Sequence, residues 1–195
     1  MSLSLYKPNS KNAGCAFSFR IGINKKLEPT LYVSAIQQFS WDSSKRSGNF
    51  SGNRENPDKN INVKFNEFEV GGILSAFKCR NEFSTFHSFE DNKTSIKFTP
   101  WDKPTKVRRG DSEVTIKLPA FGAVLTRNGN QVFRIPLEPG EVEALSEFLR
   151  FFLGELYKHR RREEIKIQKN KKAQFEKKAN TQVEPLRPTE SDAPF

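Results

Sequence analysis

Alternating hydrophobic and polar residues predict several strands in the first third of the chain. In CAFSFRI (15–21), Phe17, Phe19 and Ile21 fall on one side of an extended backbone and the intervening residues on the other. The segments LYVSAIQQFSW (31–41) and INVKF (61–65) have the same character. Residues 42–60 between them are rich in Ser, Gly, Asn and charge, and a loop of this length is usually functional or mobile.

The hydrophobic period changes at Asn66, where the sequence predicts a helix. Asn66 with Glu69 three residues later is close to a capping box. The apolar residues that follow at helical spacing are Val70, Ile73, Leu74 and Phe77. Gly71-Gly72 lowers helix propensity, so we interpret this pair as a site of close packing between the helix and a sheet.

Strand patterns return after Arg80 and are followed by a second helix. The predicted strands are FSTFHSF (83–89), TSIKF (94–98), EVTIKL (113–118) and AVLTRNGNQVFRI (123–135), with a hairpin turn at Asn128-Gly129. Pro139 lies just inside the second helix, whose apolar stripe is Val142, Leu145, Leu149, Phe152 and Leu156. The order predicts an α+β fold, with antiparallel sheets and two helices. The stripe fits packing on the chain's own sheet or, because its spacing resembles a coiled-coil seam, a subunit interface.

Charge divides the chain of 195 residues, with its net charge of +10, into three parts. Residues 1–157 hold 22 Lys and Arg against 17 acidic residues, and residues 158–178 hold ten against three, a net +7. Residues 179–195 hold one Arg against three acidic residues, with three prolines. We therefore expect a nucleic-acid-binding domain over 1–157, a basic neck over 158–178 that prolongs the helix, and a disordered linker with an acidic tip over 179–195. The positive charge of the domain over 1–157 and of the neck indicates a polyanionic partner. A solvated charged helix also fits the neck.

Sequence motifs for other classes of function are absent. There is no phosphate-binding glycine loop, nucleophile elbow or HExxH motif, and we interpret His87 as a structural histidine, so we expect neither an enzyme nor a cofactor. Cys15 and Cys79 lack zinc-site spacing and are expected to be reduced, without a metal. The first residues do not resemble a signal peptide and no apolar run could span a bilayer. We expect a cytoplasmic protein (in the host cytoplasm if it is viral) that does not enter a membrane.

Two segments interleave cations with aromatic residues, as in proteins that stack bases on rings and pair phosphates with cations. The first contributes Phe39, Trp41, Lys45, Arg46, Phe50, Arg54 and Lys59. The second contributes Lys97, Trp101, Lys103, Lys106, Arg108 and Arg109, and the outward strand face adds Lys117. Each tryptophan lies where a strand pattern passes into a polar loop, which suits either a stacking platform or a hydrophobic plug. No helix-turn-helix or basic zipper indicates duplex reading, and single-stranded RNA fits the pattern as well as DNA.

The C-terminal sequence ESDAPF resembles the tip of bacterial and phage single-stranded DNA-binding proteins, SSBs, which end in acidic residues followed by Pro-Phe. In that family the terminal ring enters an apolar pocket of a replication or repair enzyme, and its α-carboxylate meets a basic residue. The resemblance, which covers six to eight residues, assigns a partner-binding tip to Glu190, Asp192, Pro194 and Phe195. The tip is only weakly acidic and the neck unusually basic for this family. The neck therefore either binds DNA itself or holds the tip back until DNA displaces it.

The predicted body departs from the OB-fold barrel usual for SSBs, which we keep as the alternative fold in an elaborated form. Two successive units of sheet and helix are similar in layout to the Whirly-type single-strand binders, although the KGKAAL motif of the plant group is absent. In that group antiparallel sheets project from a helical core and subunits associate through their helices, which implies a homo-oligomer. We expect a sequence-non-specific single-stranded DNA-binding protein of replication, recombination or repair, with a phage as a candidate source. The alternatives are an RNA-binding protein or transcription regulator, and a scaffold whose neck binds nucleoid or membrane.

Overall fold

A computed structural model describes residues 1–110 and 112–181, with the side chains of those residues as far as 177. Its chain contacts divide into two units, Met1–Leu156 and Tyr157–Phe195. The second unit continues helix α2 (Pro139–Thr181), which starts in the first. The following paragraphs describe the first unit.

Four antiparallel strands form the first sheet, in the order β1-β2-β3-β6. They are β1 (Ser2–Lys7), β2 (Cys15–Ile23), β3 (Pro29–Gln37) and β6 (Asn60–Phe65). Phe17 and Phe19 are fully buried on one face, as the alternation of CAFSFRI predicts. Strand β1 has no counterpart in the sequence prediction.

The segment predicted as a long loop contains short ordered elements. A small hairpin joins β4 (Ser40–Asp42) to β5 (Ser47–Asn49), and one turn of 3-10 helix, η1 (Ser51–Asn53), follows. The hairpin turn is closed by Asp42, whose Oδ1 accepts hydrogen bonds from the backbone amides of Ser44 and Lys45 and from the Ser44 hydroxyl. Short-range carboxylate–amide bonds of this kind give a polar segment a defined path without an apolar core.

Helix α1 (Glu67–Cys79) begins with the predicted capping box. Asn66 Oδ1 accepts hydrogen bonds from the amides of Phe68 and Glu69, and Glu69 Oε2 accepts one from the Asn66 amide at 2.9 Å. Arg80 ends the helix in a left-handed conformation with φ of 55°. The apolar face of α1 places Val70, Ile73 and Phe77 in the core.

The second sheet has the order β10-β9-β8-β7, again antiparallel. Its strands are β7 (Phe83–Phe89), β8 (Asn92–Arg109), β9 (Ser112–Arg127) and β10 (Gln131–Leu137). Asn128 and Gly129 both have positive φ, 52° and 74°, as the predicted Asn-Gly hairpin turn requires.

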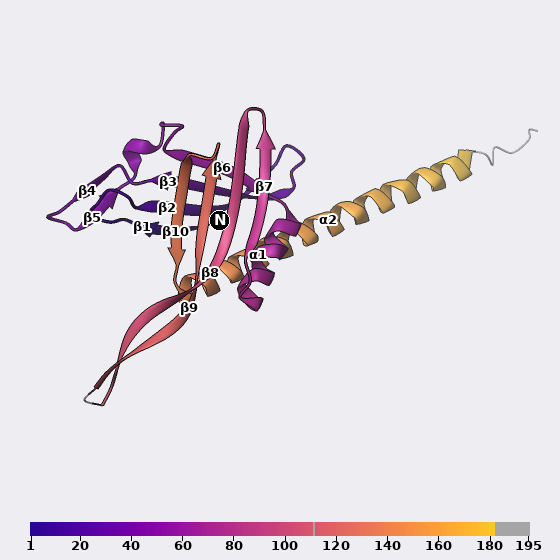
Figure 1. Ribbon diagram of the computed structural model, residues 1–195. Coiled ribbons are helices and arrows are strands. Elements are labelled where there is room, and N and C mark those ends of the chain that lie inside the picture. The colour runs from indigo at the N-terminus through magenta and orange to yellow at the C-terminus, as the bar shows by residue number, and fades with distance from the viewer. Residues whose placement is uncertain (111, 182–195) are drawn as a thin grey trace, which may run out of the picture. The chain divides into compact units, whose positions relative to one another are not determined.

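Strands β8 and β9 extend beyond the other two as a two-stranded arm, drawn clearly in Figure 1. Their pairing runs from Trp101 opposite Ala120 to Arg109 opposite Ser112, whereas β7 ends opposite Phe98 and β10 opposite Phe121. The predicted passage from strand to loop at Trp101 is therefore wrong. The predicted strand at 113–118 and the first strand of the predicted hairpin at 123–135 belong to one continuous strand, β9. Prolines such as Pro100 and Pro104 favour a loop locally, but they are tolerated in a strand that has an open side, as β8 has in the arm.

One hydrophobic core joins both sheets to both helices. The predicted stripe of α2 is buried in this core, with Leu145 and Leu149 fully inaccessible. The hypothesis that this stripe is a subunit seam is therefore wrong, because its side chains are already covered by the chain's own sheets. Cys15 is buried, Cys79 is exposed, and both are free thiols.

Within the described residues, no helix combines the length and apolar character needed to cross a membrane. In the same part of the chain, no cluster of three or more His, Cys, Asp or Glu side chains is suited to a metal ion.

Candidate nucleic-acid interface

The outer face of the first sheet contains a hollow of about 270 Å³, which we name the outer hollow. Its floor includes the small side chains of Ser18 and Ser34, which are direct neighbours on β2 and β3, beside larger ones such as Ile36 and Asn62. Its aromatic wall is made by Tyr6 of β1 and Phe50, whose rings meet edge to face with centroids 5.8 Å apart. Arg54 also lines the hollow. Small residues beside the exposed Tyr6 ring, the half-buried Phe50 ring and a cation can receive a planar base and its phosphate.

Further cations lie on the next row of the same face. Arg20, Tyr32 and Lys64 are neighbours across β2, β3 and β6. The Arg20 guanidinium lies over the Tyr32 ring, 5.5 Å from its centroid, in a cation–π contact. These side chains point outward because the residues between them along each strand, such as Phe19 and Val33, point into the core.

A second, larger depression of about 570 Å³ lies between the edge strands β6 and β7, and we name it the inter-sheet groove. Phe86 and Phe89 line it and are 59% and 73% exposed, so both rings are accessible from solvent. Lys64 and His87 also line this groove. The outer hollow and the groove share Ile61 and Asn62 of β6, so the two depressions adjoin along that strand.

Arg127 fixes the walls of the groove. Its guanidinium donates hydrogen bonds to the carbonyl oxygens of Pro57 and Asn60, and to Gln131 Oε1. Gln131 Nε2 in turn donates to Asp58 Oδ1 at 2.7 Å. The β9–β10 hairpin is thereby tied to the segment that precedes β6, so we assign Arg127 a positioning role.

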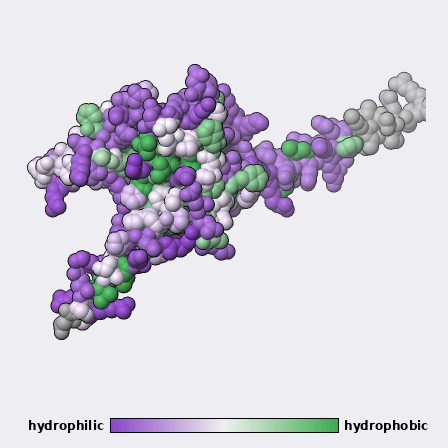
Figure 2. Space-filling model, in the orientation of Figure 1, coloured by the Kyte–Doolittle hydropathy of each residue, from purple (hydrophilic) through white to green (hydrophobic). Residues whose placement is uncertain are grey.

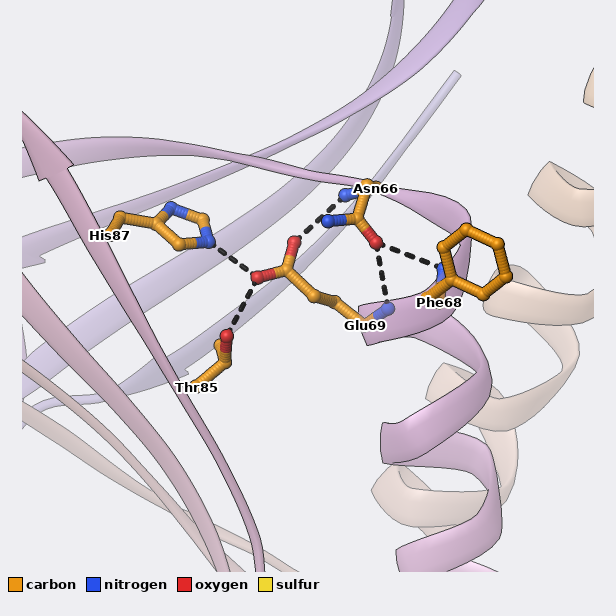
Figure 3. A network of polar contacts seen from close by, with 5 residues as sticks. All are labelled: Asn66, Phe68, Glu69, Thr85 and His87. Carbon is orange, nitrogen blue, oxygen red and sulfur yellow. Dashed lines mark hydrogen bonds and ion pairs between the residues drawn. The ribbon is translucent and has the colours of Figure 1, made fainter.

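Glu69 orients the histidine of the groove wall, as Figure 3 shows. While Oε2 completes the capping box, Oε1 accepts a hydrogen bond from the Thr85 hydroxyl at 2.9 Å and lies 2.5 Å from His87 Nε2. The nearly buried carboxylate thus connects the start of α1 to β7. This geometry fits the interpretation of His87 as a structural residue.

The predicted residues of the first segment do not all converge on the outer hollow. Phe50 and Arg54 line it. The Phe39 ring is 55% exposed and lies against Gly52, where an added Cβ would come 2.5 Å from the ring's Cγ. Trp41 is half-buried in β4.

The three predicted cations of that segment lie elsewhere on its surface. Lys45 and Arg46 are exposed in the β4–β5 turn, and the Lys59 ammonium donates to Gln37 Oε1 at 3.2 Å. None of the three is among the side chains that line the outer hollow or the inter-sheet groove.

The predicted residues of the second segment lie on β8 and β9 rather than in a loop. Lys97 forms an ion pair with Glu82 at 3.0 Å, Lys103 with Glu138 at 2.9 Å and Lys106 with Glu113 at 2.9 Å. Arg108, Arg109 and Lys117 are exposed on the arm. Among the side chains that the structure describes around the two depressions, none comes from this predicted set on β8 and β9.

Trp101 lies near the base of the arm and is 37% exposed. The guanidinium of Arg80 lies beside it, donating to Asp102 Oδ1 at 2.8 Å and lowering the pKa of that carboxyl below its usual range. Figure 2 shows hydrophobic side chains on the arm among predominantly hydrophilic ones. The arm is thus a separate surface with its own mixture of cations and apolar residues.

Sequence reasoning missed Tyr6, Arg20, Lys64, Phe86 and Phe89. Phe86 could have been found from FSTFHSF (83–89), because a strand places it on the face opposite to Phe83. Tyr6 could have been found from the alternation of SLSLYK, the β1 strand. The proposed tip residues, Glu190, Asp192, Pro194 and Phe195, lie outside the described residues.

Searches with the sequence match neither a known family model nor a curated protein. Solved structures do match. WHY1 from Arabidopsis thaliana aligns over 86% of this chain and 91% of its own, with 15% identity and a TM-score of 0.53. WHY3 from the same plant aligns over 80% and 88%, with 13% identity and a TM-score of 0.48. The plant transcriptional regulator PBF-2 aligns over 82% and 84%, with 14% identity and a TM-score of 0.48.

The match to WHY1, a Whirly protein, establishes the class of fold. The prediction of an α+β fold with antiparallel sheets and two helices in a Whirly-like layout is confirmed. The alternative of an elaborated OB-fold barrel is wrong, because the strands form two separate four-stranded sheets and a small hairpin.

Proposed function

We propose that this protein binds single-stranded DNA without sequence specificity. The observation that carries the proposal is the outer hollow, where Tyr6 and Phe50 stand beside Arg54 over a floor of small side chains. Base–aromatic stacking is worth about 1–3 kcal/mol per base and tolerates every base, because each has a π face. Such stacking requires an unpaired strand, since the base faces of a duplex are covered by their neighbours.

The adjoining depressions support a continuous path for the strand. A chain of nucleotides leaving the outer hollow over Asn62 reaches the inter-sheet groove, where Phe86 and Phe89 offer further rings. Lys64, on the same strand as Asn62, supplies a cation along this path. The Whirly-like fold supports this function, because the resemblance to Whirly-type single-strand binders implies that this chain binds single strands.

We further propose a role in DNA replication, recombination or repair, in the cytoplasm, as a homo-oligomer. The tip of Glu190, Asp192, Pro194 and Phe195 would then recruit a replication or repair enzyme, as its resemblance to SSBs implies. A phage would be one source of such a protein. The second candidate is a single-stranded RNA-binding protein or transcription regulator, which would use the same rings.

Fluorescence anisotropy tests the proposal when labelled oligo-dT, oligo-U and a duplex are each titrated with the protein at two salt concentrations. We expect tight binding of oligo-dT, weaker binding of the duplex, and a loss of affinity as salt rises. Tighter binding of oligo-U would favour the RNA candidate. The absence of any binding signal with either single strand would refute the proposal.

Deletion of Pro194-Phe195 tests the tip separately. We expect unchanged affinity for oligo-dT and lost binding to the partner enzyme. Reduced affinity for oligo-dT would instead place these residues in the DNA-binding function.

A further inference from the structure

The second unit of the chain carries cations on one face of a helix. Helix α2 continues to Thr181, so the basic neck is helical throughout its described length. Residues spaced by three or four positions lie on the same face of a helix. Six cations share one face by this rule: Lys158, Arg161, Arg162, Lys166, Lys169 and Lys172. We name this set the cationic stripe.

Two of the three acidic residues of the neck lie away from the stripe, whereas Glu176, four residues after Lys172, shares its face. Glu163 and Glu164 fall on other sides of the helix, although Glu163 reaches Lys166 with an ion pair of 2.7 Å. Lys172 contacts Glu176 at 4.0 Å. The two lysines in these pairs remain 68% and 81% exposed, and exposed pairs contribute little free energy, so a stronger anion can replace the carboxylates.

The apolar residues of the neck do not form a seam. Ile165, Ile167 and Phe175 are 41%, 53% and 73% exposed, and they lie on three different sides of the helix by their spacing. A coiled-coil partner or a membrane surface requires a continuous apolar face. The surface therefore fits a row of negative charges better than an apolar partner.

We propose that the cationic stripe binds a row of nucleic-acid phosphates and so forms a second binding site for the strand held by the first unit. The stripe offers only cations and Ile165, without an aromatic ring, so it contacts the backbone and not the bases. From Lys158 to Lys172 the helix rises about 21 Å, at about 1.5 Å per residue. One strand carries about six phosphates over that length, at one per about 3.4 Å, which equals the number of cations in the stripe.

This inference rests on the proposed function, because it requires that the ligand be a nucleic acid. It goes further in assigning part of the affinity, and most of its sensitivity to salt, to a helix outside the folded core. Of the two roles considered for the neck, it favours direct binding.

Two double variants of the full chain test the proposal with equal changes of charge. Arg162→Gln with Lys169→Gln removes two cations from the stripe. Arg160→Gln with Lys171→Gln removes two from the opposite face, since each is displaced by two residues from its counterpart. Gln has nearly the helix propensity of Arg and Lys, and circular dichroism checks that helix content is equal in both.

The measurement is the affinity for labelled oligo-dT and for oligo-dT with a duplex flank, over a series of salt concentrations. For the stripe variant we expect about 20-fold weaker binding at 100 mM salt and a salt slope smaller by about 1.4 for a single strand or about 1.8 for a duplex. The size of the change with each substrate shows which kind of strand the stripe contacts. The opposite-face variant should retain both the affinity and the slope of the wild type.

Equal losses in the two variants would overturn the proposal, because they would indicate a general effect of charge. Unchanged affinity in both variants would also overturn the proposal, because the neck would then be only a solvated spacer. A stripe variant that loses binding only to anionic phospholipid vesicles would assign the surface to a membrane and overturn it as well. In these last two outcomes the wild type still binds oligo-dT if the proposed function is correct, whereas failure of that function removes binding from all three proteins.

Discussion

The ring of Phe83 in β7 lies against the backbone of Gly72 in α1. A Cβ added to Gly72 would lie 2.3 Å from Cε2 of this ring, a separation that real Cβ atoms do not adopt. Gly71, by contrast, has no neighbouring atom within 4 Å of such a Cβ. The interpretation of Gly71-Gly72 as a site of close packing is therefore confirmed for Gly72 only. The contact sets the distance between the helix and the second sheet.

Alanine at these two positions should change stability in opposite directions. Gly72→Ala is expected to lower the free energy of unfolding by about 1–3 kcal/mol, because the added methyl group displaces Phe83. Gly71→Ala is expected to raise it by about 0.5–1 kcal/mol, since alanine favours the helix and the site is open. Urea unfolding followed by circular dichroism measures both. A stabilising Gly72→Ala would show that the Phe83 ring moves aside at no cost.

Because the Cys15 thiol is buried, we expect the protein to lose stability in alkali. Burial raises the pKa of this thiol to about 11, whereas an exposed thiol ionises near pH 9. Between these values the unfolded chain loses the proton first, so stability is complete below pH 9 and falls as the pH rises toward 11. Each pKa unit corresponds to about 1.4 kcal/mol, so the thiol accounts for about 2–3 kcal/mol in total.

The variant Cys15→Ala isolates this effect from other groups that titrate in alkali. Its free energy of unfolding, measured by urea at pH 8 and at pH 10.5, should fall less between the two than that of the wild type. An identical fall in both proteins would mean that the thiol ionises as easily in the folded chain as in the unfolded one.

Lys64 and Arg127, both in the lining of the inter-sheet groove, should differ in how they affect binding. Lys64→Gln removes one exposed cation, so we expect a salt slope for oligo-dT smaller by about 0.7 and an unchanged melting temperature. Arg127→Gln removes the hydrogen bonds to Pro57 and Asn60, so both the melting temperature and the affinity should fall. A calorimetric scan and a salt series distinguish the two roles. If Arg127→Gln changed only the salt slope, Arg127 would contact phosphate directly rather than hold the wall.

Local signals predicted much of this fold. The capping box at Asn66 and Glu69 and the turn at Asn128-Gly129 are formed by residues adjacent in sequence, so their geometry is encoded within a few positions. The alternation around Phe17 predicted the buried face of β2 for the same reason.

The arm was not predictable in this way. Its strands are held together by pairing that extends to Arg109 opposite Ser112, and the local signals of Pro100 and Pro104 oppose it. Register between strands depends on partners distant in the chain, which a local pattern does not contain.

The structure brings together part of the candidate site that the sequence predicted. Phe50 and Arg54, both from the first predicted segment, line the outer hollow together. Tyr6 became their neighbour only because β1 pairs with β2, which brings the start of the chain beside the segment after β5. The cations of the second segment were separated from the hollow because β8 and β9 carry them along the arm.

The central claim, that the outer hollow stacks bases of single-stranded DNA, is tested most directly by titrating labelled oligo-dT with Phe50→Ala and Phe68→Ala variants. Phe68 is a matched control, because it is 82% exposed at the start of α1 and lines neither depression. Fluorescence anisotropy should show binding at least about fivefold weaker for Phe50→Ala, corresponding to about 1 kcal/mol or more of lost stacking, and unchanged binding for Phe68→Ala. Equal affinity of the wild type and both variants would contradict the claim.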